Sequence, residues 1–223
     1  MISGQGRVEW RDLGRVRYAK AWRMQEDLRR ERRAGRIPDR LLLLEHDPVI
    51  TQGRRGIASD VLSGADALAA EGIELVVTNR GGRATYHGPG QLVGYFIFDL
   101  AKARLGVREF VRMVEEMLIG TVGEFGIRAE RDEGHPGIWA GGEKLAAIGL
   151  NVSHGVTQHG FALNAGCDLS PYRHIVACGI SDRGVTTMER LLDRPVGMDE
   201  LKRAAVGAAA AVFGRDMVEW DGR

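Results

Sequence analysis

The sequence predicts an α+β fold, with a largely antiparallel mixed sheet and flanking helices. Predicted strands and helices follow one another without the regular strand–helix–strand repeat of a doubly wound parallel sheet. The clearest helix runs from Val107 to Phe125, where apolar residues form one stripe at helical spacing. The stretch from Ile127 to Asn164 alternates strand-like segments with glycine-containing turns. That pattern is typical of an antiparallel meander.

The first half of the chain contains further segments with helical or strand patterns. Two regions, at 46–56 and at 80–90, look loop-like because glycine, proline and polar residues dominate them. The predicted elements are a helix from Val16 to Arg33, a strand from Leu41 to Leu44, a helix beginning at Ser63 with Asp66 as the reciprocal capping residue, a strand from Ile73 to Thr78, and a strand from Leu92 to Leu100.

The last forty residues add two more helices. A capping box from Thr186 to Glu189 predicts a short helix to Leu192. An alanine-rich helix capped by Asp199 should end near Phe213, and 217–220 is predicted to return as a strand. We find no internal repeat and no linker, so we expect one domain spanning residues 1–223.

Composition narrows the classes of function. The chain has 223 residues, enough for a sizeable core, and a net charge of +1. A nucleic-acid-binding protein normally shows a clear basic excess, so we expect no nucleic acid partner. No stretch approaches the length of a membrane span, and Cys167 and Cys178 match no zinc or disulfide pattern. We expect a cytoplasmic protein with free thiols, no membrane partner and no catalytic metal.

One glycine-rich segment, from Arg80 to Tyr95, has the densest set of polar side chains. It reads R-G-G-x-x-T-Y-H-x-x-G-Q-x-x-x-Y and resembles the signature of the lipoyl(octanoyl) transferases. Two further blocks, Gly141–Gly166 and His174–Thr187, resemble the same family, and the likeness covers roughly residues 8 to 215. The resemblance implies a fold like the catalytic domain of biotin and lipoate protein ligases.

The resemblance also implies an activity. Enzymes of this family move an octanoyl group from octanoyl-acyl carrier protein to a lysine of a lipoyl domain, through a cysteine thioester. The expected acceptors are lipoyl domains of 2-oxoacid dehydrogenase E2 subunits and the glycine cleavage H protein. A thioester is already activated, so we expect no cofactor and no ATP.

Cys178 is the expected nucleophile. A free cysteine is most often a small buried hydrophobe, and the match to the family's catalytic cysteine is what singles out Cys178. The family commonly places proline before this cysteine, where the chain has Ala177. Cys167 has no such match and is interpreted as structural.

A thiol near pKa ~8.5 is mostly protonated at neutral pH and needs a partner. The resemblance assigns this role to Lys144. A lysine in apolar surroundings loses part of the stabilisation of its charge and can accept a proton, or it can stay charged and pair with the thiolate. His87 and His174 are alternative bases, since a Cys–His pair is a common arrangement.

An eight-carbon acyl group needs a narrow, mostly apolar pocket. The small residues of two predicted strands suit such a pocket, although they equally suit strand packing. By resemblance, the expected substrate-binding residues are Arg80, Gly81, Gly82, Arg83, Ala84, Thr85, Tyr86, His87, Ala147, Ile148, Gly149, Gly160, Phe161 and Ala162.

Other interpretations remain open at this point. Six arginines between Arg29 and Arg40 are typical of a solvated helix end, or they dock the acidic carrier protein. The chain could be an ATP-dependent lipoate or biotin ligase of the same fold, which needs no nucleophilic cysteine. It could also be a non-catalytic module that binds acyl carrier or lipoyl domains.

Overall fold

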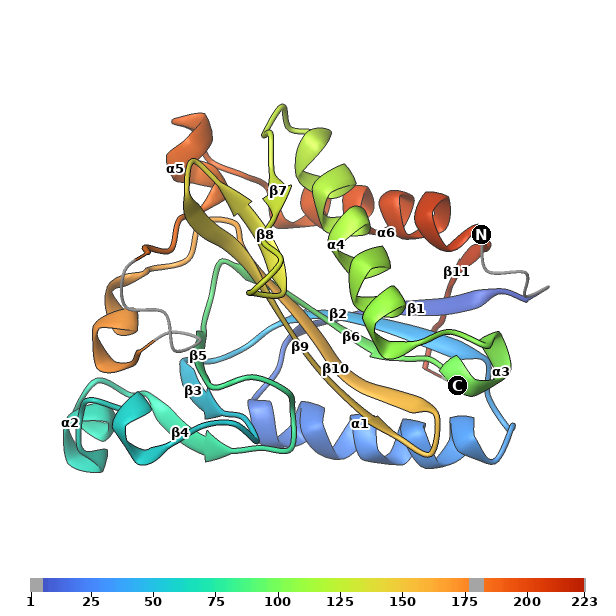
Figure 1. Cartoon of the computed structure of the whole chain (residues 1–223), viewed down its shortest axis with the longest axis horizontal. Helices are drawn as coiled ribbons and strands as arrows, with labels where there is room; N and C mark the ends of the chain where they lie inside the picture. The colour runs from blue at the N-terminus through green and yellow to red at the C-terminus, as the bar shows by residue number, and fades with distance from the viewer. Residues whose placement is uncertain (1–5, 177–182, 223) are drawn as a thin grey trace.

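The computed structural model describes residues 6–176 and 183–222 and contains a twisted sheet with helices on both faces (Figure 1). Its eight strands lie in the order β11-β1-β2-β6-β10-β9-β8-β7. All neighbouring pairs from β2 to β7 are antiparallel, and β1 is parallel to both of its neighbours. The predicted α+β class with a largely antiparallel sheet is confirmed. The strands are β1 (Val8–Arg15), β2 (Asp39–Glu45), β6 (Gln91–Ile97), β7 (Glu130–Arg131), β8 (Gly137–Ala140), β9 (Glu143–Ser153), β10 (Val156–Asn164) and β11 (Met217–Glu219).

A second sheet has three strands in the order β4-β3-β5: β4 (Glu74–Val77), β3 (Val49–Gln52) and β5 (Ala84–His87). Two of these were not predicted, because β3 and β5 lie inside the regions interpreted as loops. Each is four residues long, too short for an alternating pattern to emerge between its flanking glycines and prolines. They pair with each other antiparallel, with Thr51 opposite Thr85.

Helices cover the large sheet on both faces (Figure 1). On one face lie α4 (Val107–Gly123) and α6 (Met198–Phe213), and on the other lies α1 (Tyr18–Arg33). The apolar stripe of α4 is buried, as predicted, and it packs against the alanine-rich side of α6. Small residues let the two helices approach closely: a Cβ on Gly120 would lie 3.6 Å from the Cβ of Ala208.

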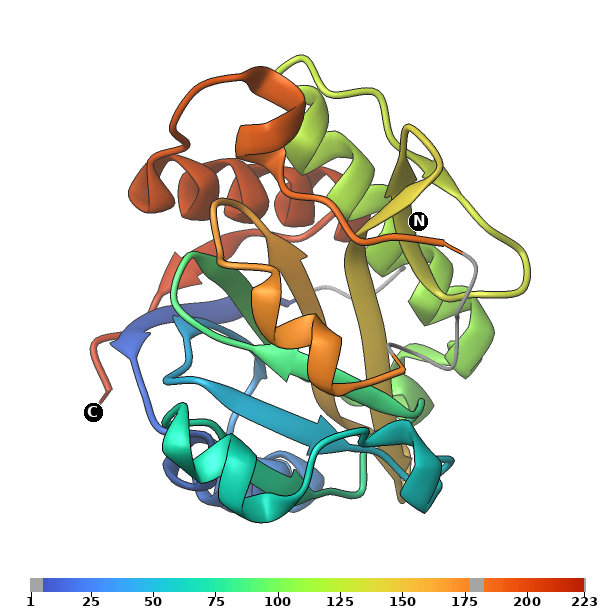
Figure 2. The ribbon, with the colours of Figure 1, turned by 90° about the vertical axis from the view of Figure 1, so that its left-hand side faces the viewer.

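The remaining helices are short. They are η1 (Ala58–Asp60), α2 (Ala65–Ala70), α3 (Leu100–Ala103), η2 (Ser170–His174) and α5 (Met188–Leu192). Figure 2 shows η2 at the end of the molecule where the small sheet lies, and there the ring of Tyr172 packs edge-on against Tyr86 of β5. None of the helices in the described part of the chain has the length and apolar character of a membrane crossing.

Three predicted helix caps are wrong. The N-cap of α2 is Gly64 and not Ser63, whose hydroxyl instead hydrogen-bonds the ring of His174. The N-cap of α5 is Thr187, one position later than predicted, and its hydroxyl accepts the N–H of Arg190. The N-cap of α6 is Gly197, two positions before the predicted Asp199, which lies in the first turn of the helix.

The arginine cluster at the end of α1 is only partly solvated. Arg32 is buried and forms ion pairs with Asp39 and Asp99, while Arg40 is buried against Glu9. Arg30 and Arg36 pair with acids on the same helix, Asp27 and Glu31. Much of the positive charge that the sequence displays is therefore matched within the chain. These pairs leave fewer of the cations for an acidic partner.

Candidate functional site

A cavity with a mostly apolar lining lies where the small sheet meets β6, β9 and β10, and it is called the apolar cavity below. Twelve of the fourteen residues expected to bind substrate line this cavity, and the exceptions are Ala84 and Tyr86. Strand alternation explains these two exceptions, because Thr85 and His87 of β5 face the cavity while Ala84 and Tyr86 face a separate core. The lining residues are Tyr18, Arg80, Gly81, Gly82, Arg83, Thr85, His87, Tyr95, Ala147, Ile148, Gly149, His159, Gly160, Phe161 and Ala162.

Three cavity residues were not expected: Tyr18, Tyr95 and His159. Tyr18 is the first residue of α1, and its position in the sequence matches the apolar stripe of that helix. His159 adopts a φ of +63°, which interrupts the alternation of β10 and brings its ring to the cavity. Tyr95 is the last position of the glycine-rich signature. Its place in that signature was the one available signal.

The floor of the apolar cavity consists of small residues on paired strands. Gly149 lies opposite Gly160, and Ala147 lies opposite Ala162. A Cβ on Gly160 would approach the carbonyl oxygen of Gly94 to 2.1 Å, so no larger residue fits there. Because these four residues carry at most a methyl group, they leave an open strip along β9 and β10.

The 80–83 segment forms one wall, and Arg80 holds it in place. The buried guanidinium donates to the hydroxyl of Thr51 at 3.0 Å, to its carbonyl at 2.5 Å, and to the carbonyl of Gly81 at 2.9 Å. The neighbouring Arg83 forms an ion pair with the fully buried Asp60. Both arginines therefore fasten the segment to the small sheet and to η1.

Three histidines around the apolar cavity are buried and neutral. Burial lowers the pKa of His46 to about 4 and that of His159 to about 3. Burial also lowers the pKa of His87 well below its usual value, with the nearby His46 and Arg80 adding to the effect. At neutral pH none of the three rings carries a charge.

The tautomer of His87 follows from its partners. The amide nitrogen of Gln91 donates to Tyr86 and Asn164, so its oxygen faces His87 as an acceptor. His87 Nδ1 lies 2.8 Å from that oxygen and carries the proton. Its Nε2 is then the unprotonated nitrogen, 3.4 Å from the hydroxyl of Thr51. Both ring nitrogens thus have polar neighbours inside the site.

Lys144 lies at a second cavity, which we call the lysine cavity. The side chain is 6% exposed, and its amine lies 4.9 Å from the ring centre of Trp139. The cavity is lined by Thr85, Trp139, Lys144, Ala147, Ala162, Asn164, Tyr172, Arg183, Gly184 and Val185. Thr85, Ala147 and Ala162 line both cavities, so the two spaces adjoin.

Cys178, the expected nucleophile, lies outside the described residues. The described residues on either side of 177–182 are well anchored. Val176 donates its N–H to the carbonyl of Asp60, and Gly184 accepts the N–H of Lys144 at 3.0 Å. Arg183, Gly184 and Val185 line the same cavity as Lys144.

The other candidate groups are committed to structural contacts. The two ring nitrogens of His174 lie 2.7 Å from the hydroxyl of Ser63 and 3.2 Å from the carboxylate of Glu71. Cys167 is buried, and desolvation raises the pKa of its thiol to about 12, so it stays protonated. No group of three or more His, Cys, Asp or Glu side chains within 6–176 and 183–222 is placed to hold a metal ion.

Comparisons with known proteins agree on one family. The profile of the lipoyl protein ligase A/B catalytic domain matches residues 17–210. An octanoyltransferase of Alkaliphilus metalliredigens is 44% identical over 209 residues, covering 93% of this chain and 96% of the relative. Another from Solibacter usitatus is 46% identical over 208 residues, covering 93% and 94%.

Solved structures show the same fold at low identity. The bipartite lipoate protein ligase of Thermoplasma acidophilum superposes with a TM-score of 0.75 at 17% identity, covering 96% of this chain and 86% of that one. The biotin protein ligase of Aquifex aeolicus superposes with a TM-score of 0.54 at 11% identity, covering 93% and 70%. The expected likeness to biotin and lipoate ligase catalytic domains is confirmed for the fold.

Proposed function

We propose, because the chain belongs to the lipoyl protein ligase A/B catalytic-domain family and to the octanoyltransferases within it, that it transfers an octanoyl group in protein lipoylation. The donor in this proposal is octanoyl-acyl carrier protein, and the acceptor is a lysine of a lipoyl domain. Lipoyl domains of 2-oxoacid dehydrogenase E2 subunits and the glycine cleavage H protein are the acceptors that we assign to it. The chain is thereby an acyltransferase that uses an activated thioester.

In the first half of the reaction, the sulfur of Cys178 attacks the carbonyl carbon of the octanoyl thioester. The amine of Lys144 accepts the thiol proton as the new carbon–sulfur bond forms. The bond to the donor sulfur breaks, and the carrier thiolate takes the proton and leaves as a thiol. A covalent octanoyl-enzyme remains, which divides the transfer into two easier steps.

In the second half, the acceptor's lysine amine attacks the same carbonyl carbon. An amide bond forms and the bond to Cys178 breaks. Lys144 removes the proton of the attacking amine and returns it to the cysteine sulfur. The enzyme regains its starting state without an outside oxidant, reductant or nucleotide.

The adjoining cavities are the observation that carries the proposal. The buried Lys144 lines one cavity, and three residues line both this cavity and the apolar cavity, so the two lie side by side. Seven apolar acyl carbons gain roughly 5–6 kcal/mol at about 0.8 kcal/mol each when fully buried. The glycine and alanine floor of β9 and β10 offers a strip on which such a chain can lie. The thioester carbonyl would then sit at the lysine end.

Intact mass spectrometry after mixing with octanoyl-acyl carrier protein tests the proposal. We expect a mass increase of one octanoyl group that is absent in Cys178→Ala, strongly slowed in Lys144→Gln, and discharged by an apo-lipoyl domain. Product formation that requires ATP, with no adduct, would identify a ligase. A complex with neither adduct nor product would identify a binding module.

A further inference from the structure

The amine of Lys144 and the indole of Trp139 face each other across two paired strands. Trp139 of β8 lies opposite Lys144 of β9 in the sheet register. The indole is 1% exposed, and the lysine amine lies 4.9 Å from its ring centre. A cation within about 6 Å of an aromatic face is attracted to it, most strongly by tryptophan. In the proposed reaction the Lys144 amine becomes such a cation when it takes up the thiol proton, so the indole stabilises the protonated amine that this step forms.

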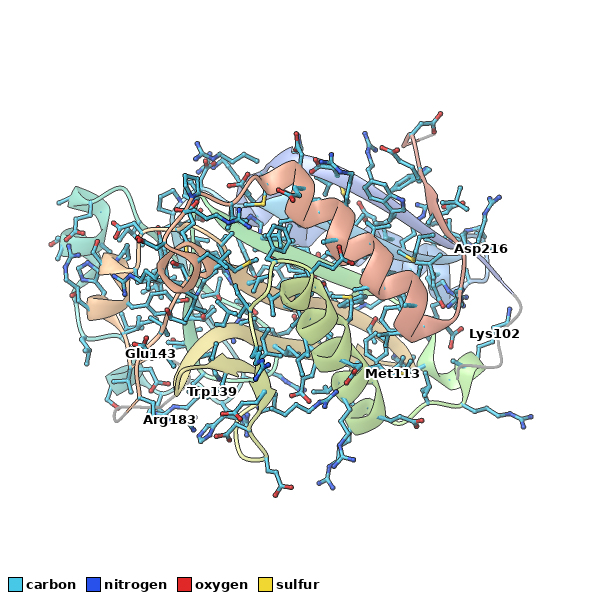
Figure 3. The ribbon with its side chains drawn as sticks, turned by 90° about the horizontal axis from the view of Figure 1, so that it is seen from above. Lys102, Met113, Trp139, Glu143, Arg183 and Asp216 are labelled. Atoms are coloured by element: carbon cyan, nitrogen blue, oxygen red, sulfur yellow. The ribbon has the colours of Figure 1, made fainter. Side chains whose placement is uncertain are left out.

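A second cation packs against the same indole. The guanidinium of Arg183 lies 3.6 Å from the ring centre of Trp139, and Figure 3 shows these side chains together near Glu143, away from Lys102 and Asp216. Arg183 also donates to the carboxylate of Asp132 at 2.5 Å. That ion pair and the neighbouring His135 lower the pKa of Asp132 to about 2, so the carboxylate stays charged at neutral pH.

The main chain of Lys144 is held as firmly as its side chain. Its N–H donates to Gly184 and its carbonyl accepts the N–H of Thr186, each at 3.0 Å. A lysine side chain loses roughly 2 kcal/mol of rotamer entropy when it is fixed in one position. The indole provides the contact that fixes the end of this flexible side chain. The backbone bonds fix only its beginning.

We propose that Trp139 is a positioning residue for the transfer reaction: its indole holds the Lys144 amine at the lysine cavity, and Arg183, tied to Asp132, holds the indole. This inference rests on the proposed function, in which Lys144 moves the proton. Trp139 lines the lysine cavity and takes no part in bond making or breaking in this scheme. It acts through Lys144 alone.

Single-turnover acylation with a small octanoyl thioester tests the inference. We expect Trp139→Leu to slow acyl-enzyme formation by about 3- to 30-fold, the range that a cation–π contact supports. The donor concentration for half-maximal rate should change less than twofold, because the acyl strip is untouched. Trp139→Phe should recover most of the rate, since phenylalanine keeps an aromatic face. Arg183→Gln should fall between the two.

Two controls separate positioning from a general loss of packing. Ile138→Val shortens the adjacent side chain of β8, which packs in the main core, and should leave the acylation rate unchanged. A double-mutant cycle places Trp139→Leu in the Lys144→Gln background, where acylation is followed for hours by intact mass. If Trp139 acts through Lys144, its replacement there has no further effect.

Each outcome decides the inference. Equal slowing by Trp139→Leu in both backgrounds, or no rescue by phenylalanine, would assign the indole to core packing and overturn it. A normal rate in Trp139→Leu, with Lys144→Gln still slow, would overturn the inference and leave the proposed function standing. A normal rate in Lys144→Gln would remove the role of Lys144, and the inference would fall with it.

Discussion

Acid should destabilise this protein between pH 7.5 and pH 5 because three histidines are buried as neutral rings. The folded-state pKa of His46 is about 4 and that of His159 about 3, and that of His87 is also well below its usual value. In the unfolded chain each imidazole has a pKa near ~6.5. Below that pH the unfolded chain binds protons that the folded chain does not. Its free energy therefore falls relative to the folded state.

The size of the effect follows from the linkage between proton binding and folding. The stability is fully present at pH values well above the unfolded pKa of about 6.5 and is lost as the pH falls from there toward the lowered folded-state pKa. At pH 5, about one and a half pH units below the unfolded value, each histidine contributes about 2 kcal/mol of destabilisation. His46 and His159 together give about 4 kcal/mol, and His87 adds to the loss in the same direction, so the effect is comparable with the whole stability of many domains.

Urea unfolding at a series of pH values measures this directly. We expect the free energy of unfolding to fall steadily from pH 7 to pH 5, and the slope to be smaller in His159→Gln. The exposed His154 is the matched control, so His154→Gln should keep the full slope. A free energy of unfolding that stays constant over this range would refute the neutral burial of these rings.

Three further predictions concern the floor and the surroundings of the site. Gly160→Ala places a Cβ 2.1 Å from a backbone oxygen and should lower the free energy of unfolding by about 1–3 kcal/mol. Gly207→Ala lies in open space on α6 and should raise the free energy of unfolding by about 0.5–1 kcal/mol. Urea unfolding compares the two variants. Ala147→Val adds two carbons where the cavities adjoin, so KM for an octanoyl thioester should rise about 15-fold. The double variant Arg29→Glu with Arg33→Glu should slow the reaction with carrier-bound octanoyl more than the reaction with a small octanoyl thioester. Equal slowing with the two donors, or none, would remove the docking hypothesis.

Sequence patterns predicted the elements with a clear hydrophobic period or a turn or cap signal, and they missed the strands β1, β3 and β5. The helix over 107–125 and the meander over 127–164 have enough turns and alternations for the period to emerge. The strand β1 was not predicted, because half of its residues are charged and most are only partly buried, although it lies between two parallel neighbours, β11 and β2. Both β3 and β5 gain their stability from each other and from tertiary contacts that no local pattern contains.

The cavity residues also fall into those that the sequence predicted and those that it did not. The stretches 80–87, 147–149 and 160–162 were found through the family signature and not through periodicity. Tyr18 and His159 were not predicted to line the apolar cavity, because the hydrophobic pattern of the helix or strand that carries each of them is already accounted for by core packing. Trp139, opposite Lys144 in the register, escaped because cross-strand pairing is a property of the fold and not of the local sequence.

Three glycines, one of them in the signature, are required because three main chains meet closely at the wall of the apolar cavity. A Cβ on Gly53 would come within 2.5 Å of the carbonyl oxygen of Gly82, and one on Gly81 within 2.9 Å of that of Leu150. A Cβ on Gly149 would lie 2.9 Å from the carbonyl oxygen of Gly81. Any side chain at these points would lift the 80–83 segment from β9 and separate the small sheet from the large one. Because the cavity exists only between those two sheets, the glycines are needed to form its wall, whatever the ligand it holds.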